Sequence, residues 1–112
     1  MELTNLERGD GISHVALAGK LDIAGLHEVD VPFHGLTAAQ QRPAIIDLSG
    51  LDYIASLGMG MLISCARSLE RRGAPMVLYG ARGPVDEALR ATAIDQIITM
   101  VDSEAAAVQA VS

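Results

Sequence analysis

Aromatic side chains are scarce in this chain of 112 residues, which contains one Phe, two Tyr and no Trp. Half of the residues are nevertheless apolar, and the mean hydropathy is positive. A packed core must therefore be built from aliphatic side chains and Met, as is usual where helices pack on a sheet. The length suits one compact domain spanning residues 1–112 and leaves no room for a second.

Cysteine is almost absent as well. A single cysteine, Cys65, excludes an intramolecular disulfide and a multi-cysteine zinc site. It lies in an apolar stretch, so we expect a buried small side chain and not a nucleophile. The three histidines, His14, His27 and His34, all lie in the first third of the chain without metal-ligand spacing. We therefore expect no metal and no cofactor, with His14 a solvated residue on a strand.

Positive charge is also in short supply, since 8 basic residues face 14 acidic ones and the net charge is −6. Nucleic-acid binding needs clustered Lys and Arg, and only Arg67, Arg71 and Arg72 come close to a cluster. Direct binding to nucleic acid is therefore not expected. No basic and then apolar segment opens the chain, and no apolar run reaches the roughly 18 residues of a membrane span. The sequence predicts a soluble, cytoplasmic protein without membrane insertion.

Strand patterns and helix patterns alternate along the chain. The Gly-Asp-Gly turn at residues 9–11 predicts a hairpin of two strands. Asp22 is a favoured cap for the helix that follows, and Pro32 predicts a kink or break within that helix. The expected elements are strands 3–8 and 12–19, a helix from 23 to about 40–42, a strand 44–48, a loop 49–55, a helix 56–72, a strand 76–79, a helix 83–92, a strand 97–100 and a helix from 103. This order predicts an α/β domain with a mostly parallel or mixed sheet of about five strands and about four helices.

Motifs for nucleotide binding or catalysis are missing. No further glycine at the required spacing follows residues 58–60 (Gly-Met-Gly), and no Gly-Lys-Ser/Thr occurs, so neither a Walker loop nor a dinucleotide fingerprint is present. Nothing in the sequence pairs a histidine with Ser56. A ligand-binding or enzymatic α/β domain is disfavoured because polar residues do not converge, and we expect no enzymatic activity.

One segment resembles a known family. Residues 47–60 read Asp-Leu-Ser-Gly-Leu-Asp-Tyr-Ile-Ala-Ser-Leu-Gly-Met-Gly. They are similar to the signature of STAS domains, the family of anti-sigma factor antagonists, in which a strand ending Asp-Leu-Ser leads to Asp-Ser-Ser/Thr-Gly-Leu-Gly at a helix start. Residues 19–22 (Gly-Lys-Leu-Asp) resemble the family's Gly-x-Leu-Asp, and residues 89–97 resemble its later helix-to-strand passage. The resemblance runs from about residue 3 to 110.

The resemblance implies a phosphorylation cycle centred on Ser56. In such proteins the unphosphorylated form binds an anti-sigma factor with serine kinase activity and releases its sigma factor, that kinase phosphorylates the serine, and a PP2C-type phosphatase reverses the switch. Two residues depart from the family: Ala55 replaces the usual Asp, and Leu57 replaces a frequent Ser or Thr. The first departure favours an alternative, a non-switching STAS subunit of a larger assembly (a stressosome-like scaffold or a lipid-transport ABC accessory protein), in which Ser56 only caps its helix.

Helical geometry around Ser56 predicts a docking surface. With 3.6 residues per turn, one stripe of this helix is buried, with Gly58 on it to permit close approach to the sheet. Gly60 keeps the flank of Ser56 open, and Leu57 and Met61 fall toward solvent. The predicted partner-binding residues are Asp22, Leu57, Gly58, Met59, Gly60 and Met61. Phosphate at a helix N-terminus is tolerated, and about two negative charges would then repel the partner. The sequence leaves a homodimer open.

Overall fold

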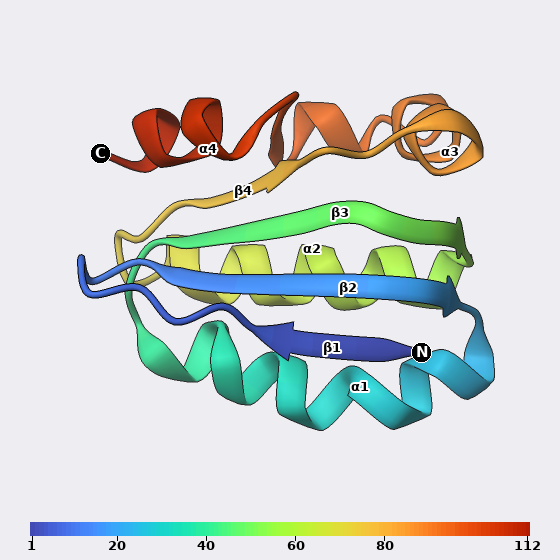
Figure 1. Ribbon diagram of the computed structural model, residues 1–112, viewed down its shortest axis with the longest axis horizontal. Coiled ribbons are helices and arrows are strands. Elements are labelled where there is room, and N and C mark those ends of the chain that lie inside the picture. The colour runs from blue at the N-terminus through green and yellow to red at the C-terminus, as the bar shows by residue number, and fades with distance from the viewer.

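The computed structural model describes residues 1–112, which fold into one five-stranded sheet with four α-helices (Figure 1). The elements, in chain order, are β1 (Glu2–Asn5), β2 (Ser13–Leu21), α1 (Ile23–Leu36), a 3-10 turn (Ala38–Gln40), β3 (Ala44–Ile54), α2 (Ser56–Glu70), β4 (Met76–Tyr79), α3 (Gly83–Ala91), a second 3-10 turn (Ile94–Gln96), β5 (Thr99–Val101) and α4 (Glu104–Val111). The strands lie in the order β1-β2-β3-β4-β5. Only β1 is antiparallel to its neighbour, so the sheet is mixed, and the predicted fold class is confirmed.

Each face of the sheet carries its own apolar cluster. Alternate residues of a strand point to opposite faces, so Ile46 and Leu78 pack with α1, α2 and α3, whereas Ile45 and Val77 pack with Ala107 of α4. The first cluster is much the larger. Helix α4 packs on β3, β4 and β5, and none of the four helices has the length and apolar character needed to cross a membrane.

Strand β3 is longer than the sequence predicts. The expected loop at 49–55 is wrong for residues 49–54, because that segment continues to pair with β2 as far as Ile54. The pairing includes two register shifts, and Gly50 lies so close to β2 that an added Cβ would be 2.9 Å from the Cβ of Ala18. This half of the strand contains polar residues and a glycine, so it lacks the apolar pattern from which a buried strand is predicted.

Helix α1 passes through Pro32 without a break. The predicted interruption is wrong: Pro32 is exposed, while Val29 and Phe33 on the inner side are buried against the sheet. The helix ends at Leu36, where Thr37 turns both its amide and its hydroxyl back to the carbonyl of Phe33. The last strand begins at residue 99 and not at 97, because residues 97 and 98 close a 3-10 turn.

Candidate partner-binding site

The site forms at the edge of the sheet where β2 and β3 end. These strands are parallel, and their last residues, Leu21 and Ile54, are register partners. The amide of Ala55 then donates to the carbonyl of Leu21 over 2.9 Å. Because α1 and α2 each begin two residues after their strands, the starts of both helices come to this one edge, at the right of Figure 1.

Ser56 is exposed at this edge and is the first residue of α2. The capping position is held by Ala55, whose backbone is extended and whose side chain offers no hydrogen bond to the helix. The alternative in which Ser56 caps the helix is therefore wrong, and its hydroxyl makes no hydrogen bond within the protein. In α1, by contrast, the predicted cap is confirmed: Asp22 Oδ1 accepts from the amide of Gly25 at 2.8 Å.

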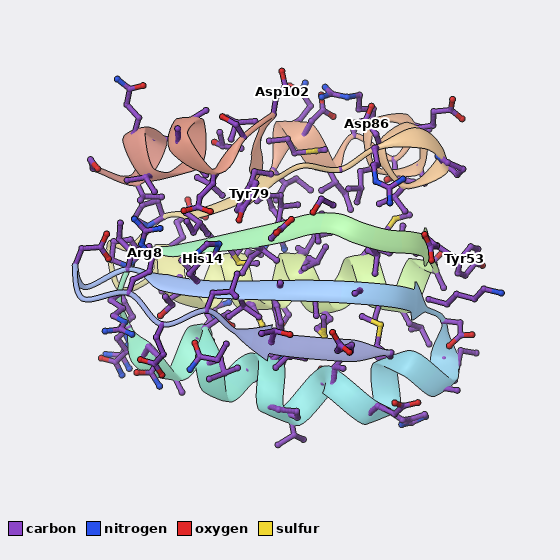
Figure 2. All side chains as sticks on the ribbon, viewed as in Figure 1. Arg8, His14, Tyr53, Tyr79, Asp86 and Asp102 are labelled. Atoms are coloured by element: carbon purple, nitrogen blue, oxygen red, sulfur yellow. The ribbon has the colours of Figure 1, made fainter.

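Three large apolar side chains are exposed at the same edge, one from each neighbouring element. They are Ile23 at the start of α1, Tyr53 near the end of β3 and Leu57 in the first turn of α2. Leu57 is 58% exposed, as predicted, and Figure 2 shows Tyr53 at the outer end of the sheet. We call these three residues the apolar patch. Ile23 and Tyr53 were not predicted as site residues, because Ile23 continues the helical spacing of the core and Tyr53 lies in a presumed loop.

The prediction that Met61 faces solvent is wrong. Met61 is 4% exposed and Met59 is also buried, so neither is available to a partner. The cause is the position of α2, which contacts α1 along one flank and approaches the end of α3 along the other, where Thr92 Oγ1 lies 3.5 Å from the sulfur of Met59. The buried arc of α2 is therefore wider than the stripe that faces the sheet.

Two glycines of α2 have the packing that was predicted, a close approach at Gly58 and an open surface at Gly60, but Gly58 was also predicted to bind the partner, and its burial leaves it unavailable for direct contact. A Cβ added at Gly58 would lie 2.7 Å from Cγ of Leu21, so the missing side chain lets α2 begin directly on the end of β2. Gly58 is buried there and shapes the site without being accessible. Gly60 is exposed with nothing within 4 Å of a hypothetical Cβ, so the surface beside Ser56 is open.

Comparison with known proteins identifies the family. A family model for the STAS domain matches residues 4–107. The chain belongs to the STAS domain family. It is 26% identical over 110 residues to BtrV of Bordetella bronchiseptica, covering 98% of this chain and 94% of BtrV, whose assignment as an anti-sigma factor antagonist is itself a prediction.

Solved structures show the same fold. An anti-sigma factor antagonist from Mycobacterium paratuberculosis matches with a TM-score of 0.81 and 25% identity, over 98% of this chain and 94% of that chain. The phosphorylated form of the Bacillus cell fate determinant SpoIIAA matches with a TM-score of 0.68 and 16% identity, over 99% and 100% of the two chains. The resemblance seen in the sequence is confirmed.

At the opposite end of this STAS domain's sheet, a buried polar pair replaces the solvated histidine predicted at position 14. His14 is 4% exposed, and its Nε2 lies 2.6 Å from the hydroxyl of Tyr79 (Figure 2). Burial lowers the pKa of His14, and burial together with the nearby Asp47 carboxylate raises the pKa of Tyr79. Both side chains are therefore neutral near pH 7, which suits a structural contact between β2 and β4.

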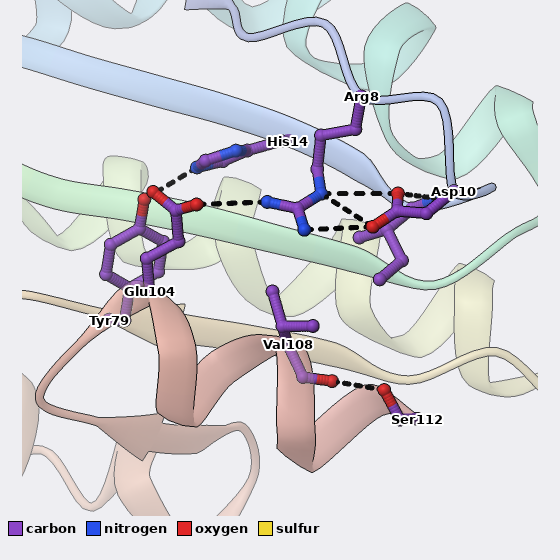
Figure 3. Close-up of polar contacts among 8 residues, drawn as sticks. Arg8, Asp10, His14, Tyr79, Glu104, Val108 and Ser112 are labelled. Atoms are coloured by element: carbon purple, nitrogen blue, oxygen red, sulfur yellow. Dashed lines mark hydrogen bonds and ion pairs between the residues drawn. The ribbon is translucent and has the colours of Figure 1, made fainter.

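An ion-pair bridge lies beside that pair and joins the two ends of the chain. The guanidinium of Arg8 donates to Asp10 over 2.9 Å and to Glu104, in the first turn of α4, over 3.0 Å (Figure 3). The pKa of Arg8 is raised and that of Asp10 is lowered, in both cases chiefly by their mutual hydrogen bond. This bridge and the buried pair both lie near α4, away from Ser56.

Cys65 is buried in α2, as predicted, with its sulfur 3.3 Å from Nδ1 of His34. Burial raises the pKa of the thiol to about 11, which suppresses the reactive thiolate. No group of three or more His, Cys, Asp or Glu side chains is arranged to hold a metal ion. The chemistry available at the surface is thus an exposed hydroxyl with apolar neighbours.

Proposed function

We propose that this STAS domain is a cytoplasmic anti-sigma factor antagonist controlled by phosphorylation of Ser56. The unphosphorylated form binds an anti-sigma factor with serine kinase activity and releases its sigma factor. Phosphorylation of Ser56 ends that binding, and a PP2C-type phosphatase restores it. The observation that carries the proposal is the unbonded hydroxyl of Ser56, exposed at the start of α2 beside the apolar patch.

The start of α2 favours a phosphate. The side chain of Ala55 leaves the first amides of the helix without a capping acceptor, and amides of a helix N-terminus stabilise negative charge. Phosphorylation therefore adds about two negative charges without opposing the fold. A partner that covers the apolar patch would then have to bury or face that charge, which weakens binding.

A second function is favoured by one observation, the alanine at position 55. Without an acidic neighbour, the hydroxyl lacks a feature that the family's phosphorylated serines usually have. The domain would then be a permanent subunit of a larger assembly, a stressosome-like scaffold or a lipid-transport ABC accessory protein, with the same edge as its contact surface. In both functions the domain binds and does not catalyse.

Phosphorylation can be tested by mass. The protein is incubated with ATP and an anti-sigma factor with serine kinase activity from the same organism, and intact mass spectrometry should show a gain of about 80 Da. Ser56→Ala should abolish the gain, whereas Ser112→Ala, at an exposed serine directly after α4, should leave it unchanged. A gain that survives in Ser56→Ala contradicts the site, and no gain in the wild-type protein favours the permanent subunit.

Binding to the anti-sigma factor is the second test. Calorimetry should show Ser56→Ala binding as the wild type does, with Ser56→Asp at least about tenfold weaker because it places charge at the contact. Equal affinities for Ser56→Asp and Ser56→Ala would refute a charge-based switch.

A further inference from the structure

The outward face of α2 carries a second feature besides Ser56, an open groove of about 470 Å³. Its polar lining consists of His34 from α1 together with Ser64, Arg67, Ser68 and Arg71 from α2 and its end. Gly60 and Ile63 also line it, nearer the start of the helix than the arginines. We call this feature the basic groove.

The basic groove is continuous with the candidate site. Ser56, Gly60, Ser64, Arg67 and Arg71 follow one another at intervals of four, four, three and four residues, which places them on one face of a helix. At 1.5 Å per residue, Arg67 lies about 16 Å along the axis from Ser56. A partner segment of about four helical turns could therefore reach from the hydroxyl to both arginines.

The two arginines of the groove are free to bind a ligand. Neither Arg67 nor Arg71 forms an ion pair or a side-chain hydrogen bond, whereas Arg8 and Arg90 are paired with carboxylates. Arg82 donates to a backbone carbonyl. The whole chain carries a net charge of −6, whereas the lining of this groove contains two arginines and no carboxylate. Beside the lining, Asp30 Oδ1 lies 3.4 Å from Nε2 of His34.

Their spacing has a cost within the isolated protein. Two arginines four residues apart on an exposed helix face repel each other, although each also interacts favourably with the C-terminal end of the helix dipole. Guanidinium groups with no internal partner bind carboxylates well, since each offers a pair of parallel N–H donors. The charge of the groove is complementary to an acidic segment.

We propose that the basic groove binds an acidic helical segment of the same protein partner that docks at Ser56. This inference rests on the proposed function for the identity of the partner. Carboxylates one turn apart on the segment pair with Arg67 and Arg71, while its other end covers the apolar patch. The groove supplies affinity and selectivity for the partner, and Ser56 supplies control.

The groove is tested first with a defined probe. A fluorescein-labelled helical peptide of about 16 residues, with Glu at every fourth position, is titrated with the protein, and anisotropy is measured at low and at high salt. Arg67→Gln/Arg71→Gln should weaken binding about tenfold at low salt, with a smaller difference at high salt. Arg72→Gln/Arg82→Gln, which removes the same charge outside the groove, should change it less than twofold.

The same variants are then measured against the anti-sigma factor. If Ser56→Asp weakens that complex but Arg67→Gln/Arg71→Gln does not, the groove proposal is overturned and the proposed function stands. If the Glu peptide binds the groove but the anti-sigma factor does not bind the protein, the proposed function fails, whereas binding of an acidic helical segment by the groove stands.

Equal losses in the groove pair and the control pair would show an effect of net charge alone and overturn the proposal. So would analytical ultracentrifugation showing that the groove pair acts only by dissociating a dimer of this chain.

Discussion

Gly58 and Gly60 offer a matched test of how closely the start of α2 packs against the end of β2. Both are helical and lie two residues apart, but a Cβ at Gly58 would meet Leu21 at 2.7 Å and Ile54 at 3.3 Å, whereas a Cβ at Gly60 would meet nothing within 4 Å. Replacing glycine by alanine inside a helix stabilises a protein by about 0.5–1 kcal/mol when space permits. Overpacking a core costs about 1–3 kcal/mol.

The two substitutions should therefore have opposite signs. Gly60→Ala should stabilise by about 0.5–1 kcal/mol, and Gly58→Ala should destabilise by roughly 0–2.5 kcal/mol after its helix gain is subtracted. The contact at position 58 is with the buried side chain of Leu21, which is held on all sides, so we expect the upper part of that range.

The assay is urea unfolding followed by far-ultraviolet circular dichroism, since the chain has no Trp. An m-value shared by the wild type and both variants would show that the two-state free energies are comparable. If Gly58→Ala proved as stabilising as Gly60→Ala, then α2 would not begin in close contact with the end of β2. Ser56 would then not lie at the edge where β2 and β3 end.

Two further predictions concern the buried titratable groups. Because burial lowers the pKa of His14 below the 6.5 of an unfolded histidine, its contribution to stability is complete above about pH 6.5 and is lost as the pH falls through the folded pKa, by at most about 1.4 kcal/mol per pH unit. Urea unfolding between pH 7 and 5 should thus show a shallower decline in His14→Gln than in the wild type, and an unchanged decline in the exposed His27→Gln; identical slopes in all three would contradict the buried pair. Cys65, with its thiol pKa raised to about 11, should react with a disulfide reagent near pH 8 at least about 100-fold more slowly in the folded than in the unfolded protein. Rates within tenfold of each other would show that the thiol is accessible.

The fold could be predicted because most local signals agreed with the final arrangement. The Gly-Asp-Gly turn predicted the antiparallel pairing of β1 with β2. The alternation of strand and helix patterns after it predicted the parallel strands. Asp22 capped α1 as its residue type predicts. The errors arose where tertiary contacts outweigh a local rule: Pro32 sits in an unbroken helix because the buried Val29 and Phe33 hold that helix to the sheet.

The candidate site was predicted only in part. Ser56, Leu57 and Gly60 could be placed from the pattern of one helix. Met61 could not, because it belongs to the large core cluster, and α2 also packs against α1, an element about thirty residues away in the chain whose position the spacing within α2 does not encode. A helical wheel divides a helix into two faces, whereas α2 has buried neighbours beneath it and beside it.

The apolar patch shows what sequence patterns omit more generally. Ile23 and Tyr53 are thirty residues apart, and neither is unusual for its own element. They come to one edge because β2 and β3 end in register at Leu21 and Ile54, so the patch is a property of strand pairing. The same register places Ser56 beside the patch. The helical periodicity of α2 then places the basic groove on the same helix face as Ser56. In the two proposals, Ser56 controls binding and Arg67 contributes affinity; the two residues lie about 16 Å apart along one helix, beyond the ~8 Å over which charges interact strongly at physiological salt. The effects of Ser56→Asp and Arg67→Gln/Arg71→Gln on partner affinity should accordingly be additive in free energy.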